Sequence, residues 1–457
     1  MDTTMLTPRR TTRAVLAAVA AGALALTAAG CGGGGEKEKG GGAAEGAKPT
    51  VDLPDLKGQK LQVAAVWTGA EQESFTKVLD EFEKRTGAEV TFVPTGDSAS
   101  TALGTKIEGG EPPDVAFLAQ VGVMHQFAEK GWLKPVGDEA TAQLEKNYGK
   151  GWRELGAYGG KQYGVYFKAA NKSLIWYNTA AFETAGVTDE PKTWKEFLET
   201  AQTVSDSGTP AVSVGGADGW TLTDWFENVY LSQAGPEKYD QLAAHEIKWT
   251  DPSVKKALTT LGELFGKKDL VAGGASGALQ TEFPKSVSQA FAEPPAAGMV
   301  FEGDFVAGVI AADTKAKVGE DAKVFPFPAV GADSPVVSGG DVAVALKDSE
   351  GARAMLTFLA STDAARIWAE QGGFVSPNKA LDTGAYPDDV TRGIAEALIA
   401  AGDDFRFDMS DQAPAAFGGT KGAGEWKRLQ DFLKNPDDVA GAQRALEADA
   451  AKAYGNG

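Results

Sequence analysis

The chain has 457 residues, a formal net charge of −19 at pH 7 and a single cysteine. The phosphates of nucleic acids and of anionic membranes repel so acidic a protein, which argues against both as partners. One cysteine allows no disulfide within the chain, so packing has to hold the fold. With 43% hydrophobic residues, a chain of this length can form substantial cores in two or three domains.

Residues 1–30 have the layout of a secretory signal peptide. Arg9, Arg10 and Arg13 precede an apolar run over residues 14–29, which is shorter than the roughly 20 residues of a membrane-spanning helix. The sequence Ala-Ala-Gly-Cys that ends at Cys31 resembles the bacterial lipobox, where the signal is removed before a cysteine that becomes lipidated. We therefore predict an exported protein.

Cys31 is followed by a stretch rich in Gly, Ala, Glu and Lys. The alternative to lipidation is a free or buried thiol, but Gly-rich sequence cannot bury it. Such a composition also lacks the apolar surface needed to fold. We therefore predict a lipidated Cys31 and a flexible tether over residues 31–58, which attach a folded body to the extracellular face of the cell membrane.

The first part of the folded body alternates strand and helix patterns. Residues 61–67, 89–93 and 114–118 predict strands, the first of them buried on both faces. Apolar residues at helical spacing over residues 75–82, followed by Gly87, predict a helix between the first two strands. This alternation predicts an α/β layer with a largely parallel sheet.

From about residue 174 the pattern is richer in helix. A capping box at residues 193–196 and the pair Asp251–Pro252 each predict the start of a helix. Residues 324–328 predict an extended connector, and Gly339 and Gly340 a tight turn that opens a further strand over residues 341–346. The C-terminal part is expected to be mostly helix and loop.

No catalytic signature is present. The chain has two histidines and lacks the H-E-x-x-H, C-x-x-C and G-x-S-x-G motifs, so we predict no enzyme activity, no cofactor and no metal. Paired carboxylates could still support glycoside hydrolysis, which leaves an exported polysaccharide-active enzyme as the alternative. With 63 acidic residues, however, such pairs arise by chance.

Ten tryptophans, several of them beside polar residues, point to a carbohydrate site. Sugars need flat aromatic faces for their C–H groups and carboxylates or amides for their hydroxyls. Trp220, Asp224 and Glu227 combine both within one short segment, and at a helix start Trp220 and Asp224 would share a face. We predict that these three residues serve the solute site; packing in a core is the alternative.

Seven motifs in order resemble the extracellular solute-binding proteins of ABC importers, in particular the family 1 carbohydrate binders and their α-glucoside group. They are "VWTGAEQESFTKVLDEFEKRTGAEV", "GGEPPDVAFLAQ", "FAEKGWLKPV", "YGVYFKAANKSLIWYN", "PKTWKEFLETAQ", "GMVFEGDF" and "SGGDVAVAL". The resemblance implies a two-lobed α/β fold with a hinge, the periplasmic-binding-protein or Venus-flytrap fold. Lobe one would comprise residues 59–167 and 327–362, and lobe two residues 168–326 and 363–457.

The resemblance also implies a function. A lipid-anchored monomer would capture an α-glucoside or similar oligosaccharide between its lobes and deliver it to an ABC permease, a separate chain that works with its own ATPase. Phe305 stands where many members of the family carry Trp. By position, the resemblance assigns solute contacts to Trp67, Glu71, Gln72, Asp97, Gln120, Lys168, Asn171, Trp220, Asp224, Glu227, Glu302, Asp304, Phe305, Gly339, Gly340, Asp341, Phe374 and Asp411.

Overall fold

The computed structural model describes residues 49–96, 99–331, 335–401 and 405–455. The predicted signal peptide, Cys31 and Asp97 lie outside these residues. Within the described part of the chain, no helix has both the length and the apolar character needed to cross a bilayer.

A six-stranded sheet contains the predicted strands of the first part of the chain. β1 (Lys60–Ala65) lies between β2 (Glu89–Pro94) and β3 (Val115–Leu118), and both pairings are parallel. β11 (Val337–Ala345) then pairs antiparallel with β3 and with β6 (Gly164–Asn171), and parallel with β12 (Arg406–Phe407). The predicted parallel sheet is therefore confirmed for its first three strands, whereas the strands added from later in the chain make it mixed.

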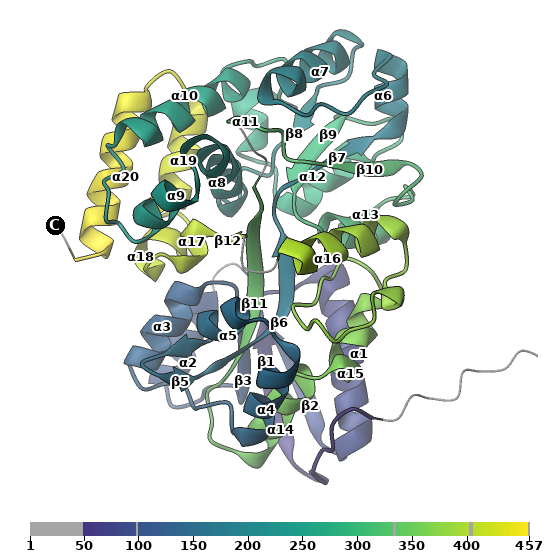
Figure 1. Ribbon diagram of the computed structural model, residues 1–457, viewed down its shortest axis with the longest axis vertical. Coiled ribbons are helices and arrows are strands. Elements are labelled where there is room, and N and C mark those ends of the chain that lie inside the picture. The colour runs from purple at the N-terminus through teal and green to yellow at the C-terminus, as the bar shows by residue number, and fades with distance from the viewer. Residues whose placement is uncertain (1–48, 97–98, 332–334, 402–404, 456–457) are drawn as a thin grey trace, which may run out of the picture. The chain divides into compact units, whose positions relative to one another are not determined.

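A second sheet has the order β10-β7-β9-β8. Figure 1 shows it in the upper half of the view and the six-stranded sheet in the lower half, with β6 and β11 running up the middle. The connector predicted at residues 324–328 is in part a strand, because β10 pairs antiparallel with β7. The bounds of this sheet are β10 (Ala322–Pro326), β7 (Leu174–Asn178), β9 (Met299–Glu302) and β8 (Val212–Ser213).

The helices begin and end where the local signals indicated. α1 (Gly69–Thr86) buries Phe75 and Phe82 and ends at Gly87, whose φ of 75° suits glycine. α7 (Trp194–Asp206) begins with the predicted capping box, and the side chain of Asp251 caps α10 (Pro252–Phe265). The remaining elements are α2 (Ala99–Glu108), α3 (Val121–Glu129), α4 (Asp138–Asn147), α5 (Lys150–Leu155), β4 (Ala157–Tyr158), β5 (Lys161–Gln162), α6 (Thr179–Ala185), α8 (Trp220–Ala234), α9 (Pro236–Ala243), α11 (Gly274–Ala278), α12 (Phe283–Ala290), α13 (Val306–Asp313), α14 (Glu350–Leu359), α15 (Thr362–Ala369), the 3-10 turn η2 (Thr383–Ala385), α16 (Asp389–Ala401), α17 (Met409–Gln412), α18 (Ala415–Gly418), α19 (Gly424–Lys434) and α20 (Val439–Ala453).

Two buried clusters of apolar side chains hold these elements together. In the first, Trp368 of α15 packs against Trp67 and Phe75, with ring centroids 4.7 and 5.9 Å away. The predicted boundary at residue 362 assigned the residues after it to lobe two. Trp368, which lies just after that boundary, instead packs with the first sheet and α1. The second cluster is centred on α8, α10 and α19 and includes Trp225 and Trp249.

Part of the predicted tether is packed on the folded body. Val51 and Leu56 are buried, and the backbone N–H of Thr50 donates to Asp363 at 2.9 Å. Arg85 joins this contact, because it pairs with Asp363 at 2.8 Å and donates to the carbonyl of Val51. The prediction of a flexible segment up to residue 58 is thus wrong for residues 50–56, which carry apolar side chains that the preceding Gly-rich stretch lacks.

Candidate functional site

Strand β6 and the residue just beyond its end position two lysines, Lys168 and Lys172, at the middle of the candidate site. Lys168 is 4% exposed and the side chain of Lys172 12%, so each needs partners for its charge. Each lysine is surrounded by carboxylates that come from distant parts of the chain. We call these groups the Lys168 cluster, which comprises Lys168, Glu71, Asp304 and Asp341, and the Lys172 cluster, which comprises Lys172, Asp224, Asp408 and Asp411.

The Lys168 cluster is built on the pairing of β6 with β11. Asp341 lies opposite Lys168 in that register and accepts a hydrogen bond from Trp67 Nε1 at 3.2 Å. The ammonium of Lys168 forms an ion pair with Glu71 at the start of α1. Asp304 accepts the backbone N–H of Asn171 at 2.7 Å. Four of the residues predicted to contact the solute thus lie together around Lys168 of β6.

Burial sets the protonation of the Lys168 cluster. It raises the pKa of Asp304 and of Asp341 to about 6, against the opposing effect of Lys168. Burial alone lowers the pKa of Lys168, but Glu71 and Asp341 raise it overall. Lys168 is therefore a cation at neutral pH, and the neighbouring Asp304 and Asp341 take up protons in mildly acidic solution.

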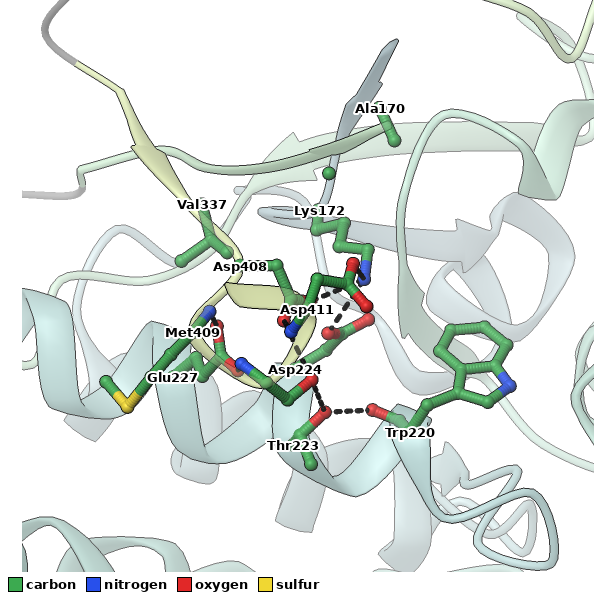
Figure 2. A network of polar contacts seen from close by, with 12 residues as sticks. Ala170, Lys172, Trp220, Thr223, Asp224, Glu227, Val337, Asp408, Met409 and Asp411 are labelled. Carbon is green, nitrogen blue, oxygen red and sulfur yellow. Dashed lines mark hydrogen bonds and ion pairs between the residues drawn. The ribbon is translucent and has the colours of Figure 1, made fainter. Parts of the chain in front are cut away.

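The Lys172 cluster gathers three aspartates around one ammonium group, as Figure 2 shows. Lys172 Nζ lies 2.5 Å from Asp408 Oδ2, 3.2 Å from Asp224 Oδ1 and 3.7 Å from Asp411 Oδ2. Asp408 is the N-cap of α17 and accepts the backbone N–H of Asp411 at 2.9 Å and the hydroxyl of Ser410 at 2.8 Å. It is therefore the best-satisfied acid of this cluster.

The three aspartates differ in protonation. Burial raises the pKa of Asp224 to about 8, although Lys172 opposes it. Burial acts in the same direction on Asp408, but Lys172 and the hydrogen bonds outweigh it and lower the pKa to about 2. Burial and the charge of Asp408 raise the pKa of Asp411 well above its usual range. The ionised pair at neutral pH is therefore Lys172 with Asp408.

Two aromatic rings lie next to the lysines. Trp220, the first residue of α8, packs against Phe305 with ring centroids 6.0 Å apart, and both side chains are half-buried. Lys168 Nζ lies 5.4 Å from the ring centre of Phe305 and Lys172 Nζ 5.7 Å from that of Trp220. Apolar ring faces beside fixed acceptors and donors are the groups that hold a polyhydroxylated solute.

Gly339 and Gly340 were expected in a turn, but they lie inside β11 and pair with Ala170 and Ala169 of β6. The turn prediction is therefore wrong. A Cβ on Gly339 would lie 2.7 Å from Cε of Lys172, so glycine leaves room for the lysine to cross the strand. A Cβ on Gly340 would lie 2.7 Å from the carbonyl oxygen of Lys168. Both glycines permit the close approach of β6 and β11 rather than a change of chain direction.

Other predicted residues lie in the core or support the clusters. Trp67 and Phe374 are 2% and 0% exposed; in the first apolar cluster Phe374 stacks on Trp368, and Trp67 meets Trp368 edge to face. Glu227 is fully buried, and its carboxylate accepts the backbone N–H of Met409 at 2.7 Å and that of Ser410 at 2.9 Å. Its contacts fix the start of α17.

The last predicted residues lie at the edges of the clusters. Gln72 and Gln120 are half-buried, and Gln120 is the N-cap of α3 near Gly419. Asn171 is buried, and its side-chain oxygen accepts the backbone N–H of Ser173 at 3.0 Å. Glu302 is buried at the end of β9.

Lys172 and Asp408 were not among the residues predicted from the sequence. Lys172 could have been found, because residues four apart on a strand face the same side and Lys168 was already a candidate. No local sequence pattern marks Asp408 as a site residue. It reaches the Lys172 cluster because β12 pairs with β11, and these two strands are far apart in the sequence.

Two further features bear on the type of site. A cavity of about 720 Å³ lies elsewhere, between α3, α5, α9 and the β12 segment, and no predicted contact residue lines it. Among the described residues, no group of three or more His, Cys, Asp or Glu side chains is arranged to hold a metal ion.

The sequence matches the family described as bacterial extracellular solute-binding protein over residues 67–366. It is 34% identical over 387 residues to the osmoprotective compounds-binding protein GgtB of Synechocystis sp., covering 83% of this chain and 90% of that protein. It is 33% identical over 413 residues to the alpha-glucosides-binding periplasmic protein AglE of Rhizobium meliloti, covering 86% and 88%. The crystal structure of the bacterial solute receptor AcbH superposes with a TM-score of 0.75 at 20% identity, covering 87% of this chain and 99% of AcbH.

The chain therefore belongs to the bacterial extracellular solute-binding protein family. The predicted family and the two-lobed α/β fold class are confirmed.

Proposed function

We propose that this protein is the solute receptor of an ABC sugar importer, that it captures a neutral α-glucoside or a similar oligosaccharide, and that it passes the sugar unchanged to a membrane permease. The solute would lie against Trp220 and Phe305, between the Lys168 and Lys172 clusters. The two lobes would move about a hinge formed by β6 and β11. A bound solute would favour the closed conformation, so the closed form would mark a loaded receptor.

One observation carries the proposal: two half-buried aromatic rings lie beside two lysine–carboxylate clusters. The aromatic faces suit the C–H face of a pyranose, and the charged groups suit its hydroxyls. Relatives named for α-glucosides and for osmoprotective compounds, which match most of the chain, support a small polar solute of this kind.

The charge of the two clusters also restricts the chemical class of the solute. The two clusters hold six carboxyl groups against two lysines, and the ammonium of Lys172 is already matched by Asp408 at 2.5 Å. A sugar acid or sugar phosphate would enter without a free cation to pair with it and would be repelled. Neutral glucosides are therefore the expected class.

A thermal-shift screen of the mature protein against neutral and anionic mono- and disaccharides tests this proposal. A neutral α-glucoside at about 100 times its dissociation constant should add about 2.7 kcal/mol to the free energy of unfolding. The matching uronic acid or phosphate should add nothing. Stabilisation by the anionic sugar alone, or steady release of glucose from the disaccharide, would reject the receptor proposal in this form.

We further propose that Cys31 is lipidated after export and tethers the receptor near its permease, which raises the effective concentration of one for the other. The motif Ala-Ala-Gly-Cys before a Gly-rich stretch supports this. Cys31→Ala should then yield protein that leaves the membrane fraction for the medium. Equal partitioning of wild type and variant into membranes would contradict the lipid anchor.

A further inference from the structure

The helices α3 and α17 are in contact, although their side chains belong to different apolar clusters. Val123 and Phe127 of α3 are part of the first cluster. Met409 of α17 and Phe417 of α18 are part of the second. Figure 1 shows α3 in the lower half of the view and α17 and α18 above it. This contact therefore joins the two halves of the fold at a place other than β6 and β11.

Backbone atoms make the contact at Gly122, the second residue of α3. A Cβ on Gly122 would lie 1.9 Å from the carbonyl oxygen of Ala413, which directly follows α17, and 3.1 Å from that of Gln412. Non-bonded heavy atoms prefer a separation of about 3.5–4.0 Å, and a backbone carbonyl cannot rotate away as a side chain can. A side chain at position 122 would therefore push α3 and α17 apart.

The backbone conformation of Gly122 does not itself require glycine. Gly122 lies within α3, and its φ is not in the left-handed region, so alanine would fit the local conformation. Alanine would also favour the helix, because glycine is a poor helix former. The close approach of the Ala413 carbonyl is thus the feature of the structure that calls for glycine here.

A second close approach and a cavity border this contact. Gly419, directly after α18, also lies against α3: a Cβ on it would be 3.3 Å from Cγ of Gln120 and 3.5 Å from Cγ2 of Val123. Val121 of α3 and Gln412 of α17 both line the cavity of about 720 Å³ described above. The tight packing between these helices is therefore confined to a small area, in which Gly122 has the least space.

We propose that Gly122 is the residue at which the two lobes meet on closing, and that its contact with Ala413 holds the lobes together without solute. The residue sets the balance between open and closed forms, although it was not assigned to the solute site. Rotation about β6 and β11 would relieve a clash at this point without unfolding either apolar cluster. That hinge rests on the proposed function, whereas the contact itself is tested without solute.

Small-angle X-ray scattering of the solute-free mature protein tests the contact, with wild type and Gly122→Ala compared. The added methyl group has no space in the closed arrangement, so Gly122→Ala should adopt the open form. We expect its radius of gyration to be larger than that of the wild type, with the circular dichroism of a folded protein.

Two control variants make this test specific. Gly104→Ala makes the same change in α2, where the nearest neighbour of a new Cβ would be the ring of Trp132 at 4.0 Å. Ala243→Leu adds more volume than Gly122→Ala, but Ala243 lines the cavity, which has room for it. Both variants should keep the radius of gyration of the wild type.

Equal radii for wild type and a folded Gly122→Ala would overturn the proposal, because the chain around α17 would then have shifted locally. Failure of Gly122→Ala to fold, while Gly104→Ala folds, would also overturn it, since the contact would then be part of one rigid core. An equal expansion in Ala243→Leu would do the same, because any added volume between these helices would then act.

Sugar binding gives a second measurement that depends on the proposed function. If Gly122→Ala is closed about a tenth as often as the wild type, a sugar that needs the closed form should bind to it roughly tenfold more weakly. Unchanged affinity together with a larger radius would reject Gly122 as the closing contact. A failure of the sugar screen would concern the proposed function alone, because the scattering results need no solute.

Discussion

The Lys168 and Lys172 clusters are centred only four residues apart, but they hold their charges differently. Lys168 pairs with Glu71, whose side chain is 28% exposed, so water shares in stabilising that acid. The Lys172 cluster has Asp224 and Asp408 at 0% and Asp411 at 8% side-chain exposure. The burial of the carboxylate partners, more than the burial of the lysine, determines how much of the folding stability depends on the ammonium group.

The largest effect is expected for Lys172→Met. Removing the ammonium leaves Asp408 charged and buried without its counter-ion, so the free energy of unfolding should fall by about 3–5 kcal/mol. Urea unfolding at pH 7 measures this loss. A loss below about 1 kcal/mol would show that the three aspartates do not depend on Lys172.

Asp341 of the Lys168 cluster and Asp408 of the Lys172 cluster should contribute to stability with opposite pH dependence. The pKa of Asp341 is raised to about 6, so its contribution to stability is present below about pH 4 and is lost as pH rises to 6. The pKa of Asp408 is lowered to about 2, so its contribution is present above about pH 4 and is lost as pH falls toward 2. Each should amount to about 2–3 kcal/mol over its window.

Asp341→Asn and Asp408→Asn separate these two contributions. Unfolding measured from pH 2 to 7 should show that the first variant lacks the decline between pH 4 and 6. The second should lack part of the decline below pH 4. If both variants show the same dependence of unfolding free energy on pH, the two aspartates do not titrate independently.

A smaller effect is expected for Lys168→Met, about 1–2 kcal/mol, because water can solvate Glu71 once the lysine is gone. The same unfolding series measures it. If Lys168→Met proves as damaging as Lys172→Met, the exposure of the partners does not explain the difference between the clusters.

The sequence predicted the fold well where the signals were local. The helix that ends at Gly87, the capping box of α7 and the strands β1 to β3 all depend on residues close in the chain. The place of β11 between β3 and β6 depends on contacts between distant segments, which no local pattern records. For the same reason the boundary predicted at residue 362 missed the packing of Trp368 on Trp67.

The candidate site was predictable to a similar degree. All four members of the Lys168 cluster were among the residues that the resemblance assigned to solute contacts by position. The Lys172 cluster depends on Asp408, which arrives with β12. Residue type alone also did not distinguish residues that could contact a solute from residues of the core. Glu227 accepts hydrogen bonds from backbone N–H groups, and Phe374 packs on Trp368.

Calorimetric titration of wild type, Trp220→Leu and Trp132→Leu with maltose, sucrose and trehalose tests the central claim most directly. Trp132 is the matched control, since it is half-buried and lies under Lys130, away from both clusters. We expect wild type and Trp132→Leu to bind one of these sugars equally well, without releasing glucose. Trp220→Leu should bind it roughly tenfold more weakly, a change of about 1.4 kcal/mol. Binding of none of the neutral sugars, or equal binding by all three proteins, would contradict the proposed site.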